Sequence, residues 1–177
     1  MIRARHLLLA LALVGSTASA GWDPVGEKPA VDDRHGFSIQ LPSTWKKFKD
    51  GAGLKFSLHG LNLDEFRVGF ERRKYSAPEA DPLAFGRRVI DTLKSRSNLA
   101  AFELQSLVET TVDGRPAFRA EATSTRTMVE PVRYRHVLYG VAGKDGDYLL
   151  LYSAPALHYF EASRPTIEAA LATFRFK

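Results

Sequence analysis

A two-residue turn, Asp113-Gly114, is the strongest indication of local structure in this chain of 177 residues. It separates two runs of alternating apolar residues, 102–108 and 118–122. Asp-Gly between such runs is typical of a β-hairpin, because both turn positions need a positive φ that these residues adopt readily. Strands joined by so short a turn run antiparallel, which argues against a wholly parallel sheet.

A second turn, 144–147, joins an expected strand at 132–141 to another at 148–153. The apolar residues of the strand 148–153 fall at both odd and even positions. A strand that is apolar on both sides is typical of a sheet covered on both faces. We therefore expect this strand at the centre of the sheet.

The remaining elements follow from the same hydrophobic periods. Asp81-Pro82 supplies an N-cap and a proline at the first helical position, which predicts a helix to about Ser97. A second helix is expected near the C-terminus, with a break at Pro165 as an open alternative. The expected order is strands 37–41, 54–58 and 66–70, the first helix, strands 102–108, 118–122, 132–141 and 148–153, a helix over 160–171, and a strand at 174–176.

Helices that follow groups of strands indicate an α+β protein and not a doubly wound one. A sheet with both faces apolar needs a cover on each side, and two helices could supply it. We expect an antiparallel β-sheet flanked by helices in an α/β/α sandwich. The composition, 45% hydrophobic and 25% charged, fits one globular domain over residues 35–177.

The first twenty residues resemble a cleaved secretory signal. Arg3 and Arg5 precede an apolar stretch, 7–14, and residues 18–20, Ala-Ser-Ala, suit signal peptidase. The apolar stretch is shorter than the roughly 20 residues that span a membrane, so we expect cleavage rather than a retained anchor. The following segment, 21–34, has no apolar period and is expected to be a flexible leader.

Composition limits the partners and the compartment. The chain has no cysteine, so no disulfide and no lipid-bearing cysteine is available, and we expect a soluble periplasmic or secreted protein. Without residues 1–20 the number of Lys and Arg falls from 25 to 23 against 20 acidic residues, a net charge of +3. This mild basicity weakly favours anionic surfaces and does not indicate nucleic-acid binding.

Four short motifs resemble the PsbP-like superfamily. The segment 35–45, HGFSIQLPSTW, is similar to the family's opening strand and its LPxxW turn. The segment 113–119, the hairpin and strand over 143–152, and the closing residues 173–176 are also similar to its pattern. The family includes lumenal proteins of photosystem II, a nuclear Ran-binding import factor and bacterial exported proteins of the DcrB type.

The resemblance implies the PsbP-like fold and a non-enzymatic binding or accessory role. It implies no catalytic residue, because family members scaffold, bind or assist assembly in unrelated systems. The chain lacks the lipobox cysteine of the lipoprotein members, which argues against a membrane tether.

Motifs for metal binding and catalysis are not recognisable in the sequence. The histidines beyond residue 20 show neither i, i+4 spacing nor an HExxH motif, and Asp32-Asp33 with His35 is interpreted as a charged leader. No G-x-S-x-G elbow is present, and Ser153 near His158 is interpreted as capping and packing. We expect no metal, no cofactor and no catalytic site.

A row of arginines is the candidate binding surface. Arg119 shares strand parity with Glu121, and Arg133 and Arg135 lie on the next strand, so the three guanidinium groups are expected on one face. Guanidinium groups bind carboxylate or phosphate through two parallel hydrogen bonds. The alternative is a solvated strand face on which Glu121 and Glu130 pair with these arginines.

Three functions are open. The favoured one is an exported binding or accessory protein of the cell envelope that contacts a protein or an anionic envelope component through an exposed apolar or Arg-lined patch. An envelope hydrolase with a dispersed site would need a nucleophile and base within hydrogen-bond reach. A lipid or small-ligand carrier would need a cavity of about 300 Å³ or more. Six aromatic residues are expected in the core rather than in a ligand groove: Trp45, Tyr134, Tyr139, Tyr148, Tyr152 and Tyr159.

Overall fold

The computed structural model describes residues 29–42, 44–50, 53–57, 64–72, 80–95, 100–127 and 130–177. The expected signal peptide, 1–20, lies outside these ranges. Residues 21–28 of the expected leader also lie outside them.

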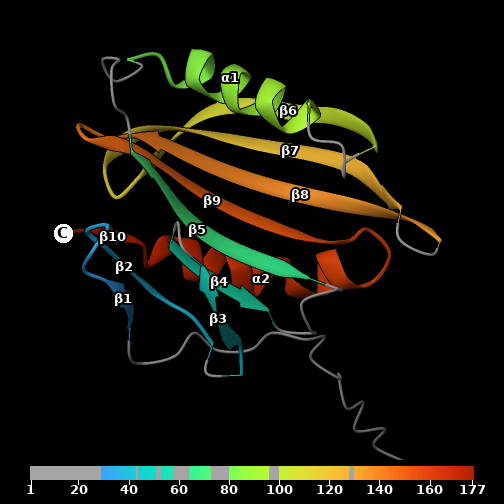
Figure 1. Cartoon of the computed structure of the whole chain (residues 1–177), viewed down its shortest axis with the longest axis horizontal. Coiled ribbons are helices and arrows are strands. Elements are labelled where there is room, and N and C mark those ends of the chain that lie inside the picture. Colours follow the sequence, from blue (N-terminus) through green and yellow to red (C-terminus); the bar gives the residue numbers. More distant parts are fainter. Residues whose placement is uncertain are drawn as a thin grey trace, which may run out of the picture.

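Most of the described chain forms one antiparallel sheet of seven strands. The spatial order is β3-β4-β5-β9-β8-β7-β6, and every neighbouring pair is antiparallel. Figure 1 shows this sheet from β6 at the top to β3 at the bottom. The strands are β3 (Lys46–Asp50), β4 (Gly53–Ser57), β5 (Glu65–Arg72), β6 (Ala100–Val112), β7 (Arg115–Thr127), β8 (Pro131–Ala142) and β9 (Gly146–Pro155).

Both predicted turns are confirmed. Asp113 and Gly114, between β6 and β7, have φ angles of 49° and 73°, as a two-residue hairpin turn requires. The turn between β8 and β9 is closed by the Gly143 amide, which donates to the Gly146 carbonyl at 2.9 Å. The central position of β9, between β5 and β8, is also as predicted.

Two helices lie on opposite sides of this sheet, α1 (Pro82–Lys94) and α2 (Tyr159–Ala172), as Figure 1 shows. α1 packs on β6, β7 and β8, and α2 packs on β9. We name the two sides of the sheet the α1 face and the α2 face. Within the described ranges, neither helix is long and apolar enough to cross a membrane.

The strand β9 contributes apolar side chains to both faces. Leu149 and Leu151 pack with the core under α1. Leu150 and Tyr152 point the other way, into the larger core on the α2 face. Alternate side chains of β9 thus pack into two separate cores, one on each face of the sheet. A strand that is apolar on both faces is stable only in the interior of the sheet, so β9 is central.

The start of α1 is as predicted. The carboxylate of Asp81 accepts a hydrogen bond from the Leu83 amide at 2.8 Å, so Asp81 is the N-cap. The helix ends at Lys94, before the predicted Ser97, with Ser95 as the C-cap. Its buried side packs on the sheet through Phe85, Gly86, Val89, Ile90 and Leu93.

Two glycines bring α1 close to the sheet by flanking the ring of Phe118. A Cβ added at Gly86 of α1 would lie 2.9 Å from Phe118 Cγ. A Cβ added at Gly140 of β8 would lie 2.1 Å from Phe118 Cε1. Since a packed core leaves no room for these atoms, the glycines set the distance between helix and sheet.

The second helix is not broken at Pro165, so that alternative is wrong. α2 is continuous from Tyr159 to Ala172. An internal proline removes a hydrogen bond and costs about 3 kcal/mol. Burial of Phe160 and Ile167 against the core offsets that cost.

Three short strands form a second sheet, with the order β1-β2-β10. They are β1 (Pro29–Asp32), β2 (Phe37–Gln40) and β10 (Arg175–Phe176). β1 lies within the segment expected to be a flexible leader, and the structure shows it paired with β2 along its whole length. Its side chains are exposed or half-buried, which explains why no apolar period predicts it.

The expected α/β/α sandwich is realised only loosely. The coarser prediction, an antiparallel sheet with helices in an α+β protein, agrees with the structure. Each face carries one helix, but α1 packs on β6 to β8 and leaves space beside β5 and β9. That space forms a concave feature of the α1 face.

Candidate binding groove

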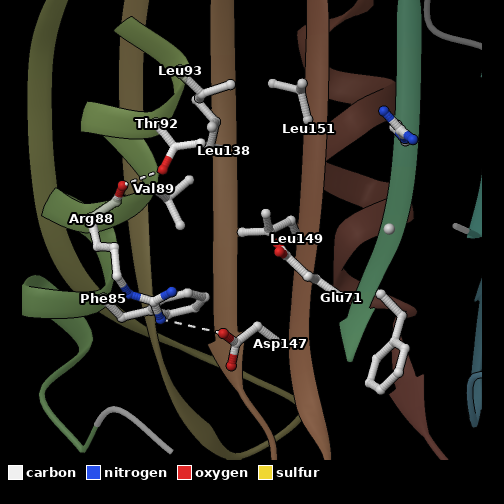
Figure 2. Close-up of a pocket in the computed structure, with 13 residues that line it drawn as sticks. Glu71, Phe85, Arg88, Val89, Thr92, Leu93, Leu138, Asp147, Leu149 and Leu151 are labelled. Carbon is white, nitrogen blue, oxygen red and sulfur yellow. Dashed lines mark hydrogen bonds and ion pairs between the residues drawn. The ribbon is translucent and has the colours of Figure 1, made fainter. Parts of the chain in front are cut away.

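A groove lies on the α1 face between α1 and β5, as Figure 2 shows. Its volume is about 230 Å³. The apolar side chains of Leu138, Leu149 and Leu151 form its floor, and Val89 borders it from α1. We call it the α1 groove, and its lining residues are Arg67, Gly69, Phe70, Glu71, Phe85, Arg88, Val89, Thr92, Leu93, Leu138, Asp147, Leu149 and Leu151.

A glycine in β5 helps to open the groove. Arg67, Gly69 and Glu71 alternate along the strand and face α1, whereas Val68 points into the core of the α2 face. Gly69 pairs in register with Leu149 of β9. Because glycine has no side chain, β5 leaves space above Leu149, next to the Glu71 side chain that Figure 2 shows beside Leu149.

One end of the groove carries carboxylates. Glu71 and Asp147 are register partners on β5 and β9. Arg88 of α1 donates to Asp147 Oδ2 at 3.3 Å, the dashed line in Figure 2, and its guanidinium lies 5.0 Å from the centre of the Phe85 ring. The Asp147 side chain is 9% exposed and the Arg88 side chain 56%, so this ion pair reaches from the groove floor to solvent.

The other end of the groove carries a guanidinium group. Arg67 lies on β5 between its register partners Lys55 of β4 and Leu151 of β9. The neighbouring Lys55 Nζ is 2.9 Å from Glu65 Oε2. The groove therefore combines an apolar floor with carboxylates at one end and Arg67 at the other.

A buried polar row crosses the α1 face beyond the groove. Ser124 Oγ lies 2.8 Å from His136 Nε2, and Ser153 Oγ lies 2.7 Å from His136 Nδ1. The Phe102 ring stacks on the imidazole, and burial, together with the charge of Arg126, lowers the pKa of His136 to about 4. A neutral imidazole has one donor and one acceptor, and the two hydroxyls satisfy both.

This row bears on the hydrolase hypothesis. Ser153 does have a histidine within hydrogen-bond distance, but it is His136 and not the predicted neighbour His158. His136 is 4% exposed and does not line the groove, and its low pKa makes it a weak base at neutral pH. His158 occupies the N-cap position of α2 without a side-chain capping bond, and Ser153 is buried, so the predicted packing holds and a side-chain cap does not form.

The structure brings Arg119 and Arg135 together on the α2 face, as the strand parity predicts. Both donate to the carboxylate of Glu121, Arg135 at 3.1 Å. Arg164 of α2 donates to the same carboxylate at 2.7 Å. Nothing in the local sequence predicts that this helix residue contacts Glu121. Burial alone would raise the pKa of Glu121, but the hydrogen bond from Arg119 and the charges of Arg164 and Arg119 hold it below its ordinary value.

Arg133 lies apart from this cluster. Its guanidinium is 3.4 Å from Thr123 Oγ1 and 3.6 Å from Glu103 Oε2. Arg135 also pairs with Glu161 of α2. The pairing with Glu121 agrees with the alternative of a charge-paired strand face, and a binding role for Arg119, Arg133 and Arg135 stays a prediction.

The acidic residues near the N-terminal sheet do not converge. His35 Nδ1 is 2.8 Å from Asp32 Oδ2 in the turn after β1. Asp33 instead pairs with Lys177, at 2.6 Å. Among the residues that the structure describes, no three His, Asp or Glu side chains are placed to hold a metal ion.

Trp45 and the five tyrosines predicted to pack in the core are not among the residues that line the groove. Trp45 stacks on Tyr152 with ring centres 6.5 Å apart and meets Phe66 edge-on at 5.7 Å. Trp45, Tyr134 and Tyr152 are buried. The partly buried Tyr139, Tyr148 and Tyr159 pack against the core of the α2 face.

Comparison with known proteins gives matches in structure only. No family model and no curated protein matches the chain. The fold resembles the solution structure of cyanobacterial PsbP (CyanoP) from Synechocystis sp. PCC 6803, with a TM-score of 0.61 and 13% identity over 93% of this chain and 99% of that one. It also resembles the Ran-binding protein Mog1p of Saccharomyces cerevisiae, with a TM-score of 0.57 and 9% identity over 86% of this chain and 96% of that one.

Two further structures extend the comparison. LpqN of Mycobacterium tuberculosis, involved in cell envelope biogenesis, matches with a TM-score of 0.51 and 13% identity over 84% of this chain and 88% of that one. A protein from Bacteroides thetaiotaomicron matches with a TM-score of 0.56 and 15% identity over 85% of this chain. The match covers 48% of the Bacteroides protein, so this chain spans about half of that protein's length. Sequence identities this low show a shared fold and do not show a shared activity. Since CyanoP, Mog1p and LpqN share the PsbP-like fold, this chain has the PsbP-like fold that its motifs predict.

Proposed function

We propose that the protein is an exported, non-enzymatic binding or accessory protein of the cell envelope, and that it contacts a protein partner at the α1 groove. The observation that carries the proposal is the groove floor, where the half-buried Leu149 and Leu151 lie beside the exposed Arg88. An apolar centre with a charged rim is the usual make-up of a protein interface.

The structural relatives support a contact role without identifying a partner. Mog1p is a Ran-binding protein, and LpqN is involved in cell envelope biogenesis. Export is supported by the signal-like composition of residues 1–20. The proposed location is the periplasm or the outside of the cell.

The size of the groove favours a protein contact over a carried lipid or drug-sized ligand. A carrier would need a cavity of about 300 Å³ or more that encloses its ligand. The α1 groove has about 230 Å³. A cavity of about 150 Å³ already holds benzene, so the groove has room for a single large side chain of a partner.

Capture from an envelope extract of the source organism tests the proposal, with Gly69→Val as the groove variant. Valine fills the space above Leu149 and is a good strand residue, so the variant is expected to fold. The matched control is the double variant Arg133→Ala with Arg135→Ala, which alters the opposite face of the sheet.

The captured protein is then purified and its affinity measured for each variant. The proposal predicts that Gly69→Val weakens binding by about tenfold or more, whereas the arginine double variant binds like the wild type. Loss in the arginine variant alone would move the contact to the α2 face. Unchanged binding by both variants would refute a contact at either surface.

A further inference from the structure

The two ends of the α1 groove carry side chains of opposite charge. Glu71 is exposed and lies beside the ion pair of Asp147 and Arg88. Arg67 lines the other end. A guanidinium group has five N–H donors, so Arg67 can bind a partner's carboxylate in addition to its contacts within the protein.

The distance between these ends matches the repeat of an extended chain. Arg67 and Glu71 are four residues apart on β5, about 13 Å at 3.3 Å per residue. Gly69 and its register partner Leu149 lie midway. An extended peptide has the same rise, so its residues i and i+4 span the two ends while residue i+2 faces the middle. A helix would place residues i and i+4 only about 6 Å apart.

We propose, on the basis of the proposed function, that the α1 groove binds an extended segment of the partner with the pattern acidic–x–apolar–x–basic, in either chain direction. The partner's carboxylate binds Arg67, its cation binds Glu71, and its apolar side chain enters the space above Leu149. The segment lies on the face of the sheet, because both edges of β5 are already paired with β4 and β9. Side chains therefore determine the specificity, rather than main-chain pairing.

The charge arrangement disfavours a lipid or fatty acid as the occupant. Such an amphiphile has one polar end, which would satisfy Arg67 and leave the acyl chain against Glu71 and Asp147. Placing an apolar chain against carboxylates removes their water without replacing its hydrogen bonds. A segment with charges of both signs avoids this loss at either end.

Four blocked pentapeptides test the proposal: Glu-Ser-Phe-Ser-Lys, Glu-Ser-Phe-Ser-Glu, Lys-Ser-Phe-Ser-Lys and Ser-Ser-Phe-Ser-Ser. Each is titrated at millimolar concentration into the isotope-labelled protein, and amide shifts are followed by NMR. We expect saturable shifts at Gly69, Leu149 and Leu151, with the Glu/Lys peptide binding about tenfold tighter than the other three. Gly69→Val should remove these shifts for all four peptides.

A charge reversal provides the second test. Arg67→Glu places carboxylates at both ends of the groove, so the variant should bind the Lys/Lys peptide best. Equal binding of all four peptides by the wild type, or tighter binding of decanoate than of any peptide, would overturn the proposal and point to an apolar ligand.

The absence of shifts at Gly69, Leu149 and Leu151 would also overturn it, and the capture experiment then separates the two proposals. A partner whose binding is lost in Gly69→Val would leave the groove contact standing and reject only the segment pattern. A partner that binds Gly69→Val like the wild type would reject the groove contact as well.

Discussion

Acid should destabilise this protein through His136. Burial and the charge of Arg126 lower the pKa of His136 from 6.5 to about 4 in the native state. Between these pH values the unfolded chain binds a proton that the native protein does not, so stability falls as the pH falls. The contribution of the neutral imidazole is fully present above pH 6.5 and is lost by about pH 4.

The size of this effect follows from the pKa shift. A pKa that falls from 6.5 to about 4 corresponds to about 3 kcal/mol, because each pKa unit is worth about 1.4 kcal/mol. The side chain is 4% exposed, so solvent screens it little. Since domains are stable by about 5 to 15 kcal/mol, this loss is a substantial fraction of the free energy of unfolding.

The variant His136→Gln isolates the effect. A Gln amide also offers a donor and an acceptor to Ser124 and Ser153 but does not titrate, and we expect it to cost about 1 kcal/mol at neutral pH. Urea unfolding, followed by the fluorescence of the buried Trp45, gives the free energy of unfolding from neutral pH down to about pH 4.5. The wild type should lose stability faster than the variant and become the less stable protein at the acid end. Parallel curves for the two proteins would refute the assignment, because His136 is the one titratable group by which the two proteins differ.

Four other substitutions test the packing and the charges. Trp45→Ala should destabilise the protein by about 3 to 5 kcal/mol, and an unchanged melting temperature would place Trp45 outside the core. Gly86→Ala should cost about 1 to 3 kcal/mol in urea unfolding despite its better helix propensity, and a stabilised variant would contradict the close approach of α1. Glu121→Gln should cost about 1 to 3 kcal/mol, because three guanidinium groups lose a charged acceptor, and thermal unfolding identical to the wild type would rule out that role. Arg133→Ala with Arg135→Ala should change the unfolding free energy by less than about 2 kcal/mol, so a double variant that fails to fold would show that these side chains are structural.

Local chemistry explains which parts of the fold could be predicted from the sequence. Asp113-Gly114 and Asp81-Pro82 determine their own backbone geometry, so the hairpin and the start of α1 are found without tertiary information. β1 and β3 carry few apolar residues and lie at sheet edges, so hydrophobic periodicity does not predict them, although each pairs with the next strand in the sequence. The break predicted at Pro165 does not occur, because burial of the apolar side of α2 outweighs the local cost of a proline inside the helix.

The arginine cluster shows a similar limit. Strand parity correctly places Arg119 and Arg135 on one face, because alternation along a strand is a local property. Arg164 joins them from α2, and only the packing of that helix brings it to Glu121. Sequence reasoning therefore predicts the row of guanidinium groups and its pairing with Glu121, but it does not predict the third arginine, which comes from the helix.

The sequence contains a partial indication of the α1 groove, which hydrophobic periodicity alone does not reveal. Phe66, Val68 and Phe70 mark one side of β5, and the opposite parity reads Arg67, Gly69, Glu71. A glycine between two charged residues on a strand is costly to sheet stability, and such a position often marks a close approach of another chain or ligand. Whether that side of β5 is covered depends on where α1 rests, and Gly86 of α1 and Gly140 of β8 hold α1 over the Phe118 ring, away from β5. Gly86 and Gly140 thus allow α1 to pack closely on β6 to β8, and the groove lies beside that contact, where Gly69 lines it.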